Sequence, residues 1–82
     1  MTAAQCLEAR RLLRWSRERL SARTGLAATT LQVFEHTGRM PQSKWEPADR
    51  LGMVRRVFER AGVEFINNAD GQDVRLRSGQ SG

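Results

Sequence analysis

Apolar residues recur every three or four positions through most of the chain, which is the spacing of helices with one buried face. Thr2 and Ser16 are suitable N-caps for such segments, while Gly25 and Gly38 fall where helices should end. Pro47 fits the first turn of the last helix. The pattern predicts helices at about residues 3–14, 16–23, 27–36 and 47–61, the last with an apolar stripe of Leu51, Val54, Phe58 and Ala61.

After Gly62 the apolar positions alternate with polar ones, as they do in half-buried strands. Two such segments, at about 63–67 and 73–77, flank residues 67–72, which are rich in turn formers. We therefore expect a C-terminal β-hairpin and a single domain over residues 1–77. Residues 78–82 are expected to form a flexible tail.

The second and third predicted helices are short and are joined by a glycine turn. Leu20, Leu26, Leu31 and Phe34 supply apolar side chains where these helices would meet. Gly25 can adopt the positive φ that a sharp corner between crossed helices requires. In a small basic chain, this pattern indicates a helix-turn-helix whose second helix enters a DNA major groove.

The charge is concentrated in the half that contains this pattern. The chain has 82 residues and a formal charge of +5, enough for one domain with a modest core. Seven arginines and three glutamates give residues 1–39 a charge of +4, whereas residues 40–82 carry +1. A basic surface fits nucleic-acid binding, and its alternative is a solvated face without a partner.

The sequence shows no Ser/His/Asp, Cys/His or paired-carboxylate arrangement typical of catalysis, and little that could hold a metal. One cysteine, Cys6, and one histidine, His36, cannot supply four protein ligands, and Cys6 falls on an apolar stripe as a small core residue. We expect no enzymatic activity, cofactor or small-molecule substrate. Because no apolar segment approaches the length of a membrane span, we expect a cytoplasmic protein without membrane association.

Several short stretches give the chain a family resemblance. They are Gln5, Arg10, Leu12, Leu13, Trp15, Ser16, Leu20, Gly25, Leu31, Phe34, Glu35 and residues 61–66. Over about residues 3–77 the chain resembles the lambda-repressor-like (Cro/repressor, XRE-type) helix-turn-helix regulators, in a bacterial subgroup that appends a β-hairpin. The resemblance implies a mainly α, four-helix DNA-binding domain. It also implies a transcriptional regulator, with repression favoured.

Three features depart from this family pattern. Arg17 stands where relatives usually carry glutamine, and Ala28 stands where they often carry a longer polar or basic side chain. The loop over residues 36–46 is also longer than usual. The first two departures affect DNA specificity, not the fold.

If Leu31 and Phe34 point inward, the third predicted helix presents Ala28, Thr29, Gln32 and Val33 to DNA bases. Gln32 can bond an adenine edge, and Thr29 can donate or accept a hydrogen bond. Ala28 and Val33 can contact thymine methyl groups, so the set favours A·T pairs.

Phosphate contacts are expected at both ends of this motif. Ser16 and Arg17 begin the second predicted helix, where backbone N–H groups can also hold a phosphate. Arg39 and Lys44 follow the third helix, and further phosphate contacts could come from Arg10, Arg14 and Arg23. The alternative for each arginine is a solvated charge.

A domain of this size makes few base contacts by itself, so a second copy of the chain is an expected partner. Regulators of this kind usually bind palindromic sites as two-fold dimers, so we expect a homodimer on double-stranded DNA. The hairpin could form the dimer through its edge or through Phe65, Val74 and Leu76, or it could simply close the core of the monomer. The alternative function is a protein–protein interaction module, such as an antitoxin or adaptor.

Overall fold

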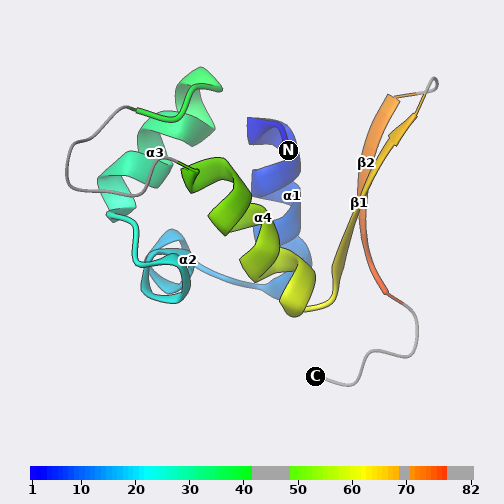
Figure 1. The fold of residues 1–82 in the computed structure, drawn as a ribbon. Helices are drawn as coiled ribbons and strands as arrows, with labels where there is room; N and C mark the ends of the chain where they lie inside the picture. The colour runs from blue at the N-terminus through cyan, green and yellow to red at the C-terminus, as the bar shows by residue number, and fades with distance from the viewer. Residues whose placement is uncertain (42–48, 69–70, 78–82) are drawn as a thin grey trace.

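The computed structural model describes residues 1–41, 49–68 and 71–77. In these ranges, four helices precede two strands that pair antiparallel as a C-terminal hairpin (Figure 1). The described chain is therefore mainly helical, as the sequence predicts. The predicted tail at 78–82 lies outside the described residues. The elements are α1 (Ala3–Leu13), α2 (Arg17–Thr24), α3 (Ala28–Thr37), α4 (Arg50–Arg60), β1 (Val63–Asn68) and β2 (Gly71–Leu76).

The predicted N-caps are confirmed at the first two helices. Thr2 Oγ1 accepts the backbone N–H of Gln5 at 3.1 Å, and Gln5 Oε1 accepts that of Thr2 at 2.9 Å, which completes a capping box. Ser16 Oγ accepts the N–H of Arg19 at 3.0 Å and so begins α2. Ala27 begins α3 without a side-chain cap.

The fourth helix differs from its prediction. It begins at Arg50, because the carboxylate of Asp49 accepts the N–H of Gly52 at 3.2 Å and makes Asp49 the N-cap. The predicted start at residue 47 lies outside the described residues. The predicted stripe was wrong at Leu51, which is 38% exposed. The helix is turned so that Arg50, Val54 and Phe58, four residues apart, form its buried face.

Other ends shift by one or two residues from the predicted ones. The first helix stops at Leu13, because Arg14 adopts a left-handed conformation with φ of 58°. The second and third helices start and end one residue later than predicted. In the hairpin, Asn68 pairs with Gly71, so two residues separate the strands where the sequence suggested a six-residue turn.

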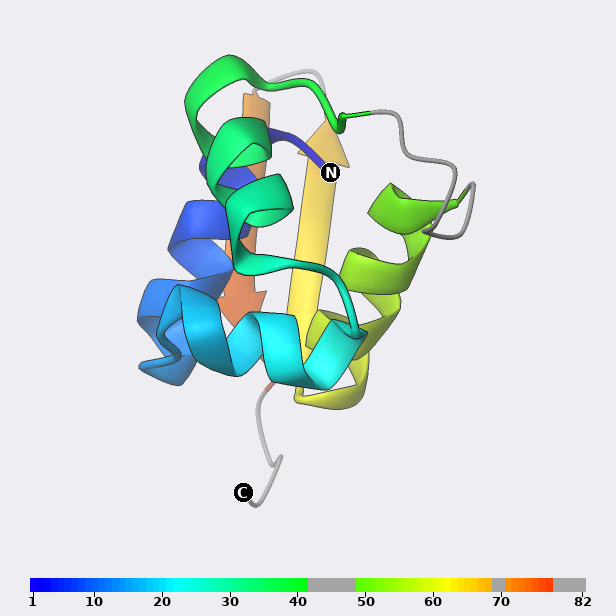
Figure 2. The same cartoon turned by 90° about the vertical axis from the view of Figure 1, so that its left-hand side faces the viewer.

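All four helices lie on one side of the hairpin (Figures 1 and 2). β2 lies against α1, and β1 lies against α4. The register pairs Phe65 with Val74 on the face that reaches the core. The hairpin therefore closes the core of the monomer, whose buried apolar residues are Cys6, Ala9, Leu20, Leu26, Leu31, Phe34, Val54, Phe58, Val63 and Val74.

Gln5 attaches the first helix to the hairpin by a polar contact. Its side-chain amide donates to Asn67 Oδ1 at 3.1 Å and to the backbone oxygen of Asp73 at 3.4 Å. Gln5 is 3% exposed, whereas Asn67 and Asp73 are exposed, so the contact lies at the edge of the core. Within the described ranges, no helix has the length and apolar character needed to cross a bilayer.

Candidate nucleic-acid interface

The link between α2 and α3 is held in one conformation by short-range hydrogen bonds. Gly25 has φ of 79°, as its place in the turn predicts. The hydroxyl of Thr24 donates to the oxygen of Leu20 at 2.9 Å and accepts the N–H of Leu26 at 3.2 Å. The hydroxyl of Ser21 donates to the oxygen of Leu26. The predicted apolar contacts are confirmed, because Leu20, Leu26, Leu31 and Phe34 are all buried.

The outward face of α3 carries most of the predicted base-contacting residues. Thr29 and Gln32 are exposed, and Val33 is 44% exposed although it is a large apolar residue. Ala28 is only half-buried, so its methyl group also reaches the surface. These four residues share one helix surface and could contact a common ligand.

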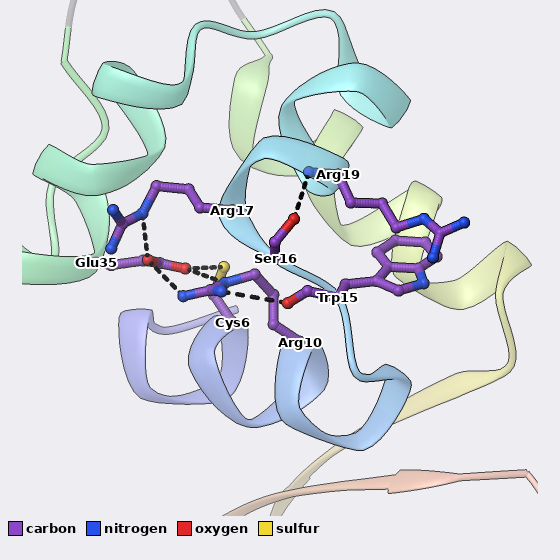
Figure 3. Close-up of polar contacts among 7 residues, drawn as sticks. All are labelled: Cys6, Arg10, Trp15, Ser16, Arg17, Arg19 and Glu35. Atoms are coloured by element: carbon purple, nitrogen blue, oxygen red, sulfur yellow. Dashed lines mark hydrogen bonds and ion pairs between the residues drawn. The ribbon is translucent and has the colours of Figure 1, made fainter.

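The inward face of α3 ends in a buried carboxylate, that of Glu35, whose side chain is 3% exposed. Arg10 of α1 binds it with two nitrogens, Nε to Oε2 at 2.8 Å and Nη2 to Oε1 at 3.0 Å. Arg17 of α2 donates from Nε to Oε1 at 3.1 Å (Figure 3). One carboxylate therefore connects three helices.

Two neighbouring groups complete this Glu35 cluster. The thiol of Cys6 contacts Oε2 at 3.6 Å, and Arg10 Nη1 donates to the backbone oxygen of Trp15 at 3.3 Å. Trp15 is the residue before the N-cap of α2, so Arg10 also fixes the path of the chain into that helix (Figure 3). Charged hydrogen bonds of this kind are stronger than neutral ones.

The cluster shifts the pKa values of its two acidic groups in opposite directions. Burial alone would raise the pKa of Glu35, but the hydrogen bonds and charges of Arg10 and Arg17 outweigh burial and lower it below 4.5. Burial raises the pKa of the Cys6 thiol to about 12, and the charge of Glu35 adds to this effect. Glu35 is therefore ionised and Cys6 neutral at pH 7.

Arg17, predicted to contact phosphate, has a structural contact as well. In the described part of the chain, Nε is its one hydrogen-bonded nitrogen, and its side chain remains 29% exposed. The two terminal nitrogens can therefore donate to an external anion while Nε holds Glu35. This arrangement positions the guanidinium beside the start of α2.

Two of the other three predicted phosphate contacts lie at the two ends of the motif. Ser16 is exposed and accepts the N–H of Arg19, which leaves its own hydroxyl proton free to donate. Arg39 is exposed just after α3, where its backbone N–H donates to Thr37 Oγ1 at 3.1 Å. Lys44 lies outside the described residues.

The roles of Arg10 and Glu35 in this site were not predicted from the sequence. Arg10 was expected as a further phosphate contact, but its side chain is 16% exposed and binds Glu35. A signal was present in the spacing, because Glu35 follows the buried Leu31 by four positions and so lies on the same helix face.

No protein-family model matches the chain, and no curated protein matches it.

Proposed function

We propose that this protein binds double-stranded DNA sequence-specifically and regulates transcription, with repression the favoured outcome. The observation that carries the proposal is the surface of α3. Its apolar side is buried, while Thr29, Gln32 and Val33 are exposed, and the partly exposed side chain of Arg17 is bound to Glu35 of the same helix. The resemblance to lambda-repressor-like regulators, noted in the sequence, supports the same function.

In the proposed complex, α3 lies in the major groove. Gln32 bonds the N6 and N7 groups of adenine, Thr29 bonds a neighbouring base edge, and Val33 or Ala28 contacts a thymine methyl. None of these four side chains can form the bidentate arginine contact that reads guanine. The preferred site is therefore rich in A·T pairs.

Phosphates on either side of the groove are bound by the flanking elements. Ser16 and Arg17 meet one strand at the start of α2, and Arg39 meets the backbone beyond the end of α3. Since a single domain makes few base contacts, two copies bind two-fold related half-sites about one helical turn apart.

This function is tested by selecting bound sequences from a pool of random duplexes. The affinity for the selected duplex is then measured as a function of salt concentration. We expect an enriched A·T-rich palindrome and an affinity that falls with salt at a log–log slope of roughly −0.9 per phosphate contacted. Absence of measurable binding to selected and bulk duplex alike would overturn the proposal. It would favour the protein-interaction module in its place.

Two variants separate base reading from phosphate binding. Gln32→Ala should weaken binding to the selected site by about 1–3 kcal/mol and relax preference at one position. Arg17→Ala should weaken binding to all DNA sequences by a similar factor and reduce the slope of log affinity against log salt by about 1. Arg11→Ala is the charge-matched control, because Arg11 is exposed on α1 and pairs with Glu8. An unchanged sequence preference in Gln32→Ala would show that α3 is oriented differently.

A further inference from the structure

A small cleft lies where the end of α2 meets the end of α4. It has a volume of about 210 Å³ and is lined by Trp15, Arg23, Val57, Arg60 and Ala61. Figure 3 shows that Trp15 and Arg17 extend to opposite sides of α2, so this cleft is separate from the proposed base-contacting surface of α3. A ligand here would not compete with bases for α3.

The base of the cleft is apolar and rests on the buried core. The ring of Trp15 stacks on the buried ring of Phe58, with 5.9 Å between the centroids and 28° between the planes. Val57 and Ala61 are half-buried beside it. An apolar group entering the cleft would therefore meet a preformed surface and would order few side chains on binding.

The rim of the cleft carries positive charge without a counterion. Arg23 and Arg60 are both exposed, and across the described ranges no carboxylate forms an ion pair with either of them. The guanidinium carbon of Arg23 lies 5.4 Å from the centroid of the Trp15 ring. This stacking holds one cation at the mouth while its donors remain available.

We propose that the cleft binds an acidic segment of a partner protein, with an apolar side chain on Trp15 and a neighbouring carboxylate between Arg23 and Arg60. Charge complementarity selects this occupant, because arginine forks match carboxylates. The volume suits one side chain, since sites for whole small ligands are usually about 300–1,000 Å³. Because this surface is separate from α3, the proposal does not rest on DNA binding.

The test follows the indole N–H signal of Trp15 by NMR in a Trp45→Phe background, which leaves a single indole. The probes are acetyl-Leu-Glu-Glu-Leu-amide and its neutral counterpart acetyl-Leu-Gln-Gln-Leu-amide. We expect the acidic peptide to shift the Trp15 signal and to bind at least about tenfold more tightly than the neutral one. Equal binding of the two peptides, or no shift with either, would overturn the proposal.

Two arginine variants locate the interaction. Arg60→Gln should weaken binding of the acidic peptide about fivefold. Arg56 lies on the same helix but is paired with Asp49, so Arg56→Gln should change the affinity of the peptide less than about twofold. Equal losses in the two variants would mean unspecific attraction to a basic domain. Displacement of the peptide by duplex DNA would assign the cleft to phosphate binding, which also contradicts the proposal.

Discussion

Glu35 must be ionised for its contacts to form, since Arg10 and Arg17 both donate hydrogen bonds to its carboxylate. Its side chain is 3% exposed, so the carboxylate depends on these donors for its hydrogen bonds. Breaking a buried charged pair leaves the remaining charges without compensation and is strongly destabilising. The same carboxylate positions Arg17 at the proposed DNA surface, so stability and binding are joined at this residue.

We expect Glu35→Gln to reduce the free energy of unfolding at about pH 7 by about 3 kcal/mol. The pKa of Glu35 is lower in the folded protein than its ordinary 4.5, so in acid the unfolded chain binds the extra proton. The stabilisation is therefore complete above about pH 6 and is lost as the pH falls through the folded pKa. Urea unfolding from about pH 7 to 2 should show wild type and variant converging in acid.

Glu8→Gln is the matched control, because Glu8 forms an exposed pair with Arg11 at 3.5 Å. It should change the free energy of unfolding by less than about 1 kcal/mol at any pH. If Glu8→Gln and Glu35→Gln lowered stability equally, the buried cluster would not be a special source of stability.

Cys6 should resist thiol reagents while the protein is folded. Its side chain is fully buried, and burial raises its pKa to about 12, so little thiolate exists near pH 8. Labelling with a chromogenic disulfide should be at least about a thousandfold slower in the native protein than in urea. A native rate close to that in urea would contradict the burial of this thiol.

At the scale of elements, the turn between α2 and α3 depends on a backbone conformation. Gly25 has φ of 79°, yet a Cβ placed on it would meet no heavy atom of the described chain within 4 Å. Gly25→Ala should therefore reduce stability by about 1 kcal/mol through strain alone, and Gly25→Asn by less, because asparagine tolerates this region. Urea unfolding of both variants checks the order, and an equal or larger loss in Gly25→Asn would contradict it.

The residues that cap the helices were the most predictable part of the molecule. Ser16, Gly25 and Gly38 act within one turn of chain, so their chemistry can be recognised without the fold. The start of α4 was less predictable, because Pro47 and Asp49 are both good first-turn residues and sequence does not rank them. Its buried face was correctly predicted at Val54 and Phe58 and wrongly at Leu51, because Arg50 takes a position that an apolar residue would normally fill.

The candidate site was predictable on its outer face and not on its inner one. Exposure of Thr29 and Gln32 follows from the burial of Leu31 and Phe34 through helical spacing. The Glu35 cluster joins residues 10, 17 and 35, and only the packing of three helices brings them together. Local patterns carry no information on which distant charges will meet.

At the scale of the whole molecule, the hairpin should be required for folding. Val63 and Val74 are buried against the helices, and Phe65 packs edge-on to Phe58 at 6.1 Å. Removing residues 63–82 would expose this core and forfeit about 5 kcal/mol of apolar burial, most of the stability that a small domain has. Thermal unfolding by circular dichroism should lose its cooperative transition.

A shorter truncation provides the control for this experiment. A chain that ends after Arg77 keeps the hydrogen bond from the backbone N–H of Arg77 to the backbone oxygen of Gly62 at 2.8 Å. If residues 78–82 are the predicted flexible tail, this truncation should leave the midpoint of thermal unfolding unchanged within a few degrees. A cooperative transition retained by the 1–62 chain would show that the helices fold alone.

The division of α3 between two faces has an evolutionary consequence. Leu31, Phe34 and Glu35 hold the helix in place, while Thr29 and Gln32 make no contribution to the core. Substitutions at the outer positions can therefore accumulate without loss of the fold. If α3 reads DNA as proposed, a lineage descended from this protein could exchange the DNA sequence that it binds one base at a time while its scaffold remained unaltered.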